Sequence, residues 1–169
     1  MKTFLLATVM ALGFTTAALA QNKDTSDRGF FIGGQVGSFT GKNDRLAVGV
    51  NGGYQFHRFF RAEVTAENAW KSNSGAGSMV FANIVPQYRV PGTILTPYAL
   101  AGVGYSFDSL GSVKKGGAVP VYNLGLGMRA AITDRIDADI RYRNVRAFEG
   151  KNARVRDDHI FTVGASYKF

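Results

Sequence analysis

The sequence predicts an all-β protein, an eight-stranded antiparallel up-and-down transmembrane β-barrel. The 169-residue chain opens with a short apolar segment typical of exported proteins. The rest of the chain contains eight stretches of alternating side chains, separated by turn-rich connections. One face of every stretch carries no Asp, Glu, Lys or Arg. This face needs an apolar solvent, and a closed barrel in a lipid bilayer provides one.

The composition excludes several other classes of protein. The 21 Gly residues argue against a mainly helical chain, because each Gly inside a helix costs roughly 1 kcal/mol relative to Ala. The absence of Cys excludes disulfide frameworks, Cys-ligated zinc and thiol nucleophiles. A formal net charge of +8 often indicates a nucleic-acid partner. We expect no nucleic-acid partner for an exported chain, and no cofactor.

Residues 1–20 are predicted to be a signal peptide. Lys2 supplies the positive charge, residues 4–14 form the apolar core, and Ala18-Leu19-Ala20 is a small-x-small cleavage site. The apolar run is shorter than the about 20 residues that a spanning helix needs. Residues 21–28 then form a polar periplasmic leader, and residues 29–169 form the barrel domain.

Each of the eight predicted strands has the length that a tilted strand needs to cross a membrane, about 9–11 residues or slightly more. The strands lie near residues 29–39, 45–56, 59–71, 78–90, 96–107, 119–132, 136–147 and 158–169. Large apolar side chains mark the outward face of each in chain order: Phe30 and Ile32; Leu46 and Val50; Phe60 and Val64; Val80 and Ile84; Val103 and Tyr105; Leu124 and Leu126; Ile136 and Ile140; Phe161 and Val163.

The opposite face of the strands is expected to be small or polar and to line the lumen. Gly recurs on it at two-residue spacing, for example at Gly125 and Gly127, and a narrow eight-stranded barrel has room only for side chains. This face also carries four basic and four acidic residues away from the rims: Arg61, Glu63, Glu67, Arg129, Asp137, Asp139, Arg141 and Arg143.

Charges in a poorly hydrated lumen must pair. A hairpin centred on Asp134 places Arg129 opposite Asp139, and half a circumference separates the third and seventh strands. We therefore expect Glu63 and Glu67 to reach across toward Arg141 and Arg143, forming a salt-bridge network that closes the barrel to solutes. The alternative is a selectivity filter of a small pore, or a proton path.

The connections predict how the barrel is oriented. Short turns near 55–59, 90–96 and 133–136 lie with both termini in the periplasm, and the connections near 40–45, 72–77, 108–118 and 148–157 lie outside. The outer connections and rim carry a basic surface: Lys42, Arg45, Lys114, Lys115, Lys151, Arg154 and Arg156. This surface suits lipopolysaccharide phosphates or sulfated host glycans; the alternative is an ordinary solvated surface.

The last strand alternates perfectly and ends on an aromatic residue, with Phe161, Val163, Ala165, Tyr167 and Phe169 on one face. This pattern resembles the terminal strand that the outer-membrane assembly machinery recognises during biogenesis. We therefore expect these five residues to act as an assembly signal.

Five segments carry a resemblance to a known family: Gly29-Phe30-Phe31-Ile32-Gly33-Gly34, residues 96–105, Asn123-Leu124-Gly125-Leu126-Gly127, Ile132-Thr133-Asp134-Arg135 and Tyr167-Lys168-Phe169. The mature chain resembles the small eight-stranded, porin-like outer-membrane barrels of Gram-negative bacteria, of the opacity-protein and attachment–invasion type. The resemblance implies an outer-membrane location, contact with membrane lipid and lipopolysaccharide, and roles in adhesion, serum resistance or envelope stability. Host glycans or proteins are further expected partners, and we expect a monomer.

We expect a non-enzymatic protein that serves envelope structure or surface interaction, with no catalytic or metal-binding residues. The alternatives are an adhesin for lipopolysaccharide or host glycans, or a lipid A-modifying enzyme with a His–Ser pair, here His159 and Ser38. The lipid A deacylase pattern places Ser two residues after the His, where this chain has Phe161. The Gly125-x-Gly127-x-x-Ala130 stretch fits a loose dinucleotide pattern, but no helix is expected to follow it.

Overall fold

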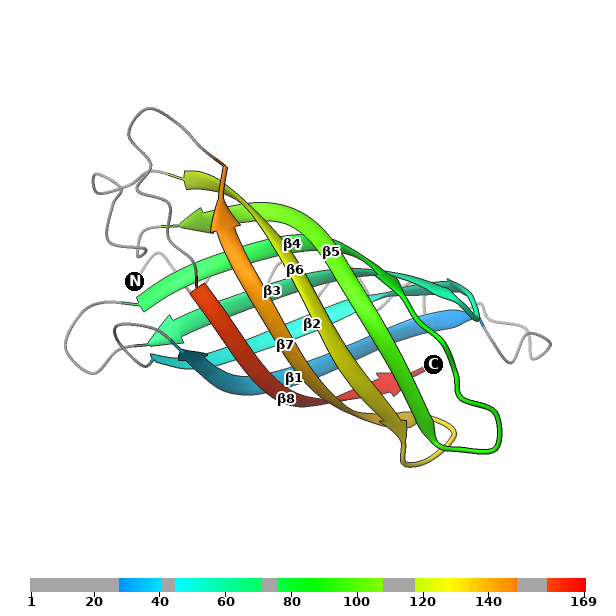
Figure 1. Ribbon diagram of the computed structural model, residues 1–169. Helices are drawn as coiled ribbons and strands as arrows, with labels where there is room; N and C mark the ends of the chain where they lie inside the picture. Colours follow the sequence, from blue (N-terminus) through cyan, green and yellow to red (C-terminus); the bar gives the residue numbers. More distant parts are fainter. Residues whose placement is uncertain (1–27, 41–44, 71–75, 108–117, 149–157) are drawn as a thin grey trace.

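The computed structural model describes residues 28–40, 45–70, 76–107, 118–148 and 158–169, and these residues form a closed barrel (Figure 1). Each strand pairs with its chain neighbours in antiparallel fashion, and β1 pairs with β8 to close the barrel. The strands are β1 (Gly29–Thr40), β2 (Arg45–His57), β3 (Phe60–Trp70), β4 (Ala76–Pro86), β5 (Leu95–Phe107), β6 (Ala118–Ala131), β7 (Ile136–Ala147) and β8 (Asp158–Lys168). The predicted fold class and all eight strands are confirmed.

The ends of β4 differ most from the prediction. The sequence pattern extends this strand to residue 90, but β4 ends at Pro86 and its ladder with β5 stops at Ile84 opposite Ala101. Pro86 on β4 and Pro97 on β5 both lack the N–H that a regular ladder needs. The chain then continues through one isolated bridge, Gln87 to Tyr98, into a turn that contains Gly92 at a positive φ of 74°.

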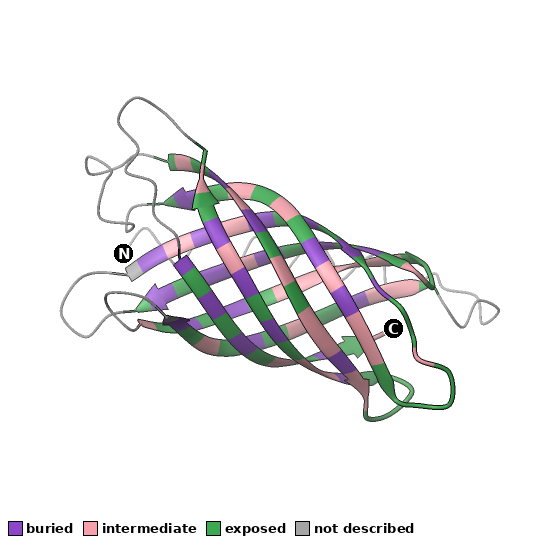
Figure 2. Ribbon diagram, in the orientation of Figure 1, coloured by how far each residue is buried: buried purple, intermediate pink, exposed green. Residues whose placement is uncertain are grey.

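The outward face is apolar, as the alternation predicts. Exposure reaches 65% at Leu126 and 60% at Ile84, and no described residue of the predicted outward face is buried. Figure 2 shows buried and exposed residues alternating along the strands. This exposure in a folded protein indicates that a lipid phase surrounds the barrel. Among the described residues, no helix has the length and hydropathy needed to cross a membrane.

The two ends of the barrel are distinguished here by their connections. The turn end holds the β2–β3, β4–β5 and β6–β7 turns together with Gly29 and Lys168, and the far end is the opposite one. Aromatic pairs surround the turn end, among them Phe30 with Tyr54 at 4.8 Å and Tyr167 with Phe169 at 5.2 Å between ring centroids. Such aromatic rings are typical of the interfaces of transmembrane barrels.

The expectation of a uniformly small or polar interior is wrong for the far half of the lumen. An apolar cluster fills this region, and we call it the apolar plug: Phe39, Ala47, Ala69, Met79, Phe81, Val121, Val145 and Ile160, all buried. Alternation assigns these residues to the inner face but does not say that the interior must be polar. A narrow lumen sealed from water is stable when apolar side chains fill it.

Candidate functional site

The charged residues of the lumen gather in its centre. Arg61, Glu63 and Glu67 project inward from β3, Arg129 from β6, and Asp137, Asp139, Arg141 and Arg143 from β7. Seven of these eight residues are buried, and the side chain of Asp139 is 12% exposed. The period of two along a strand explains this gathering, because residues at i, i+2 and i+4 share one face.

The first layer of charges joins opposite walls of the barrel. Arg141 Nη1 donates to Glu63 Oε1 at 2.6 Å, and Arg141 Nη2 donates to Glu63 Oε2 at 3.1 Å. The second neighbour of Arg141 is Asp139, with 3.5 Å between Arg141 Nε and Asp139 Oδ1. Tyr98 completes this layer, because its hydroxyl donates to Asp139 Oδ2 at 2.7 Å and accepts from Arg141 Nε at 2.9 Å.

The second layer lies nearer the far end, with Arg143 one inward position beyond Arg141 and Glu67 two beyond Glu63. Arg143 donates to Glu67 Oε1, and the amide of Gln35 donates to the same oxygen. Both charged side chains are fully buried. The apolar plug begins on the far-end side of this layer. The guanidinium carbon of Arg143 lies 5.8 Å from the ring centroid of Phe81, a residue of the plug.

Neutral side chains extend the network around the wall. Asn51 and Thr65 donate to the two oxygens of Glu63 at 3.1 and 3.0 Å. A chain then runs from Asn123 to Asn83 at 2.9 Å and from Asn83 to Thr65 at 3.2 Å. The sequence reasoning did not single out Thr65, Asn83 or Tyr98. Each of these residues occupies an inward-facing alternate position of its strand, as the charged residues do on theirs. This alternation is the signal that could have predicted their place in the network.

The third layer faces the turn end and centres on Asp137. Lys168 Nζ lies 3.0 Å from Asp137 Oδ1, while Arg61 Nη2 and Arg129 Nε lie 3.9 and 4.0 Å from Asp137 Oδ2. Arg129 does stand directly opposite Asp139 in the β6–β7 register. The ion pair of Arg129 nevertheless runs to Asp137, while Asp139 pairs with Arg141.

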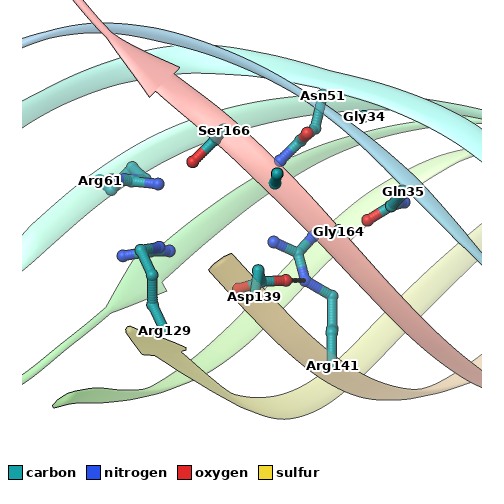
Figure 3. Close-up of a pocket in the computed structure, with 10 residues that line it drawn as sticks. Gly34, Gln35, Asn51, Arg61, Arg129, Asp139, Arg141, Gly164 and Ser166 are labelled. Carbon is teal, nitrogen blue, oxygen red and sulfur yellow. Dashed lines mark ion pairs between the residues drawn. The ribbon is translucent and has the colours of Figure 1, made fainter. Parts of the chain in front are cut away.

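Two cavities adjoin these layers. A small cavity of about 10 Å³ is lined by Arg61, Arg129, Asp139 and Arg141 among others (Figure 3), and such a space holds about one water molecule. A larger cavity of about 750 Å³, which we call the vestibule, occupies the lumen at the turn end. From the turn end to the far end, the lumen therefore passes from the vestibule through the charged layers to the apolar plug.

The predicted basic surface is represented by one residue in the described part of the chain. Arg45 begins β2 at the far end and is half-buried. The other six residues fall outside the described segments: Lys42, Lys114, Lys115, Lys151, Arg154 and Arg156. The predicted signal peptide and residues 21–27 of the leader fall outside them as well.

The residues of the predicted assembly signal lie on the outward face of the closing strand. Phe161, Val163, Ala165, Tyr167 and Phe169 are all exposed. Four of them belong to β8, and Phe169 follows it with its amide donating to the carbonyl of Phe30 at 3.0 Å. The last strand thus pairs with β1 up to the final residue of the sequence.

The candidate His–Ser pair is not brought together by a hydrogen bond in the described structure. The ring of His159 contacts β7, with Nδ1 at 2.6 Å from the Tyr142 hydroxyl and 3.4 Å from the Asn144 amide. The hydroxyl of Ser38 instead donates to the carbonyl of Phe39 at 3.5 Å. Across the described strands and turns, no group of three or more His, Asp or Glu side chains could hold a metal ion.

Comparison with solved structures identifies similar barrels. Neisserial surface protein A is 15% identical, covers 85% of this chain and 97% of its own, and superposes with a TM-score of 0.66. The N-terminal β-barrel domain of Pseudomonas aeruginosa OprF is 13% identical, with 82% and 97% covered and a TM-score of 0.62. Ail, the attachment invasion locus protein of Yersinia pestis, is 15% identical, with 84% and 97% covered and a TM-score of 0.53.

These likenesses show a shared fold. No curated protein sequence matches the chain at a significant level. The family model of the outer membrane protein beta-barrel domain matches residues 6–169, which is nearly the whole sequence. The chain therefore belongs to the outer membrane protein β-barrel domain family.

Proposed function

We propose that this protein is a non-enzymatic, monomeric barrel of the Gram-negative outer membrane whose lumen is closed by its own side chains and which serves the structure of the envelope. Residues 1–20 direct its export, and the outer-membrane assembly machinery recognises its last strand. The turn end faces the periplasm, because short turns and chain ends are typical of that side. Membrane lipid and lipopolysaccharide surround the outward face.

The two-point ion pair between Arg141 and Glu63 is the observation that carries the proposal. These residues are 1% and 2% exposed, and they join strands on opposite sides of the lumen. An ion path along the axis has to break this pair and the Arg143–Glu67 pair. It also has to pass the apolar plug, whose eight buried side chains cannot replace the hydration of an ion.

Planar-bilayer recording tests the proposal. Purified protein is expected to give no steady, ion-sized conductance, and heat-modifiable gel migration verifies that the barrel is folded. The double variant Glu63→Ala/Arg141→Ala keeps the apolar plug and is expected to stay closed. Adding Glu67→Ala, Arg143→Ala, Phe81→Ala and Met79→Ala to this variant removes both ion pairs and two large side chains of the plug, and should produce measurable current. Large, steady conductance of the folded natural protein would overturn the proposal.

A second candidate function is surface interaction through anionic groups outside the cell. Its support is the set of seven basic residues in and beside the far-end connections, with Arg45 at the start of β2. Exposed Arg146 on β7 adds a further cation near this end. A structure of Yersinia pestis Ail holds the heparin analogue sucrose octasulfate, and its likeness to this chain at 15% identity concerns the fold alone.

Binding of intact cells to immobilised heparin tests this second function. Replacing Lys114 and Lys115 by Ser should weaken binding, while replacing Arg58, at the turn end, should leave it unchanged. Equal binding by cells that lack the protein would exclude an adhesive role. The non-enzymatic assignment has its own test, because hydrolysis of labelled lipid A that disappears in His159→Ala would contradict it.

A further inference from the structure

We propose that the vestibule at the turn end is a binding site for the phosphate group of a small anion, a function separate from closing the lumen. The site does not depend on the proposed role in the envelope. Its volume of about 750 Å³ exceeds that of a phosphate ion, so the vestibule has room for a phosphate ester as well. Its positive charge, its unpaired hydrogen-bond donors and the fixed positions of two arginines suit it to an oxyanion.

The side chains that line the vestibule carry a large excess of positive charge. Asp134 and Asp137 are its two acidic side chains. Seven cationic side chains line the same space, with Arg61, Arg129 and Lys168 at the floor and four more arginines toward the rim. A concave surface of one sign with low-dielectric walls concentrates field lines and attracts ions of the opposite sign.

At the floor of the vestibule three cations share one lining carboxylate, and Glu63 and Asp139 are the further carboxylates that attract Arg61. Asp137 is the carboxylate that Arg61, Arg129 and Lys168 share, and it makes its closest contact, 3.0 Å, to Lys168. Arg61 and Arg129 stand 3.9 and 4.0 Å from it and repel each other. Asp139 borders the adjoining small cavity, but its ion pair is to Arg141.

Both floor arginines have donors without a hydrogen-bond partner. Arg61 is 2% exposed and Arg129 is 4% exposed, and both border the vestibule as well as the small cavity. Nε of Arg61 and Nη2 of Arg129 are buried and make no hydrogen bond in the structure. Their remaining polar contacts are to neutral amides, Gln55 at 3.3 Å and Gln87 at 2.7 Å. Buried guanidinium donors left unpaired are costly, and an oxyanion would satisfy them.

Aromatic rings hold the two guanidinium groups in place. The guanidinium carbon of Arg61 lies 3.8 Å from the ring centroid of Phe31, and that of Arg129 lies 4.9 Å from the ring centroid of Tyr98. Figure 3 shows Arg61 and Arg129 on one side of the small cavity, away from Asp139 and Arg141. Stacked guanidinium forks lose little freedom on binding and match the oxygens of phosphate.

Calorimetric titration with inorganic phosphate tests this site. Protein refolded in a neutral detergent is titrated at constant ionic strength against a chloride background, and saturable binding at one site is expected. Arg61→Gln and Arg129→Gln should each weaken binding about tenfold or more, the usual effect of losing a charge-assisted hydrogen bond. Arg61→Lys keeps the charge but loses the fork, so it should bind more weakly than the natural protein and more tightly than Arg61→Gln.

Arg146→Gln is the matched control, because it removes the same charge from an exposed position near the far end. Its affinity for phosphate should equal that of the natural protein, and heat-modifiable migration verifies the fold of every variant. Absence of saturable binding to the folded protein would overturn the site. Equal weakening by Arg146→Gln and Arg61→Gln would also overturn it, because that result indicates general charge attraction.

Nanodiscs distinguish the source of the phosphate group. If phosphatidylglycerol nanodiscs abolish binding of inorganic phosphate and phosphatidylcholine nanodiscs preserve it, an anionic lipid headgroup occupies the site. Equal binding in both identifies a soluble phosphate as the ligand. Either result supports the site, and both are independent of the conductance that tests the closed lumen.

Discussion

Arg141 on β7 and Glu63 on β3 form a two-point ion pair across the centre of the barrel, with N–O distances of 2.6 and 3.1 Å. The strands that carry them lie on opposite sides of the lumen, so the pair links two walls that share no backbone hydrogen bond. Asn51 and Thr65 satisfy the remaining capacity of the carboxylate. Such full hydrogen bonding is what makes a buried ion pair tolerable.

Removing one member of this pair should destabilise the barrel strongly. Glu63→Leu leaves the Arg141 charge buried with Asp139 alone, and the expected loss of unfolding free energy is about 3–5 kcal/mol. The double variant Glu63→Leu/Arg141→Met removes both charges and should recover much of that loss. Urea unfolding in lipid vesicles measures both variants together with Arg141→Met alone, and simple additivity of the two single substitutions would contradict a direct coupling.

The apolar plug should contribute to stability through packing. Phe81 is fully buried, and Phe81→Ala is expected to cost about 3–5 kcal/mol, the usual result for a buried Phe. Ile84→Ala serves as control, because Ile84 lies on the same strand and is 60% exposed on the outward face. Unfolding in urea should separate the two variants, and similar losses for both would show that Phe81 is not packed in the lumen.

Gly127 should not tolerate a side chain. The ring of Tyr98 occupies the space that a Cβ at this position would need. Gly127→Val is therefore expected to displace Tyr98 from Asp139 and to cost about 1–3 kcal/mol, as overpacking does. At Gly34 the nearest atom to an added Cβ lies 4.0 Å away. Gly34→Val should accordingly fold with unchanged heat-modifiable migration, and equal damage at both positions would refute the explanation.

Charge on the outward face should be penalised according to depth in the bilayer. Leu126 is 65% exposed in the middle of β6. Leu126→Arg is expected to lower the free energy of unfolding by about 2–4 kcal/mol, the usual cost of Arg at the centre of a bilayer. Ile132 is 60% exposed just beyond the end of β6. Ile132→Arg should lower the free energy of unfolding by only about 0–1 kcal/mol, because it lies near the interface. Folding titrations in vesicles measure the difference, and equal costs would contradict the membrane placement of β6.

The sequence predicts the strands and their faces because both follow from a period of two. Val50 and Leu126 are large and apolar, whereas the residues next to them in the chain are small or polar. This contrast between the two faces of a strand predicts which face meets lipid. The alternation does not show what fills the lumen at each depth. Phe39 and Phe81 share the inner face with Glu63, yet they pack in a separate apolar region.

The pattern predicts that Glu63 and Glu67 meet Arg141 and Arg143, as they do in the structure, but it does not predict the partner of Arg129. Register alone places Arg129 opposite Asp139, and the structure has that register. The long side chain of Arg129 extends along the barrel axis as well as across it, and it meets Asp137 and Gln87. Tyr98 in turn occupies the oxygen of Asp139 that faces it. Side-chain direction and competing donors settle such pairs, and strand periodicity encodes neither.

Site-directed spin labelling tests the sidedness of the barrel most directly. The chain has no native Cys, so single Cys substitutions at Val50, Leu126 and Ile140 can each carry one label. In lipid bilayers these labels should be accessible to oxygen and protected from a water-soluble relaxation agent, as expected for side chains in contact with acyl chains. Accessibility to the water-soluble agent at all three positions would place the apolar face in water and contradict the account.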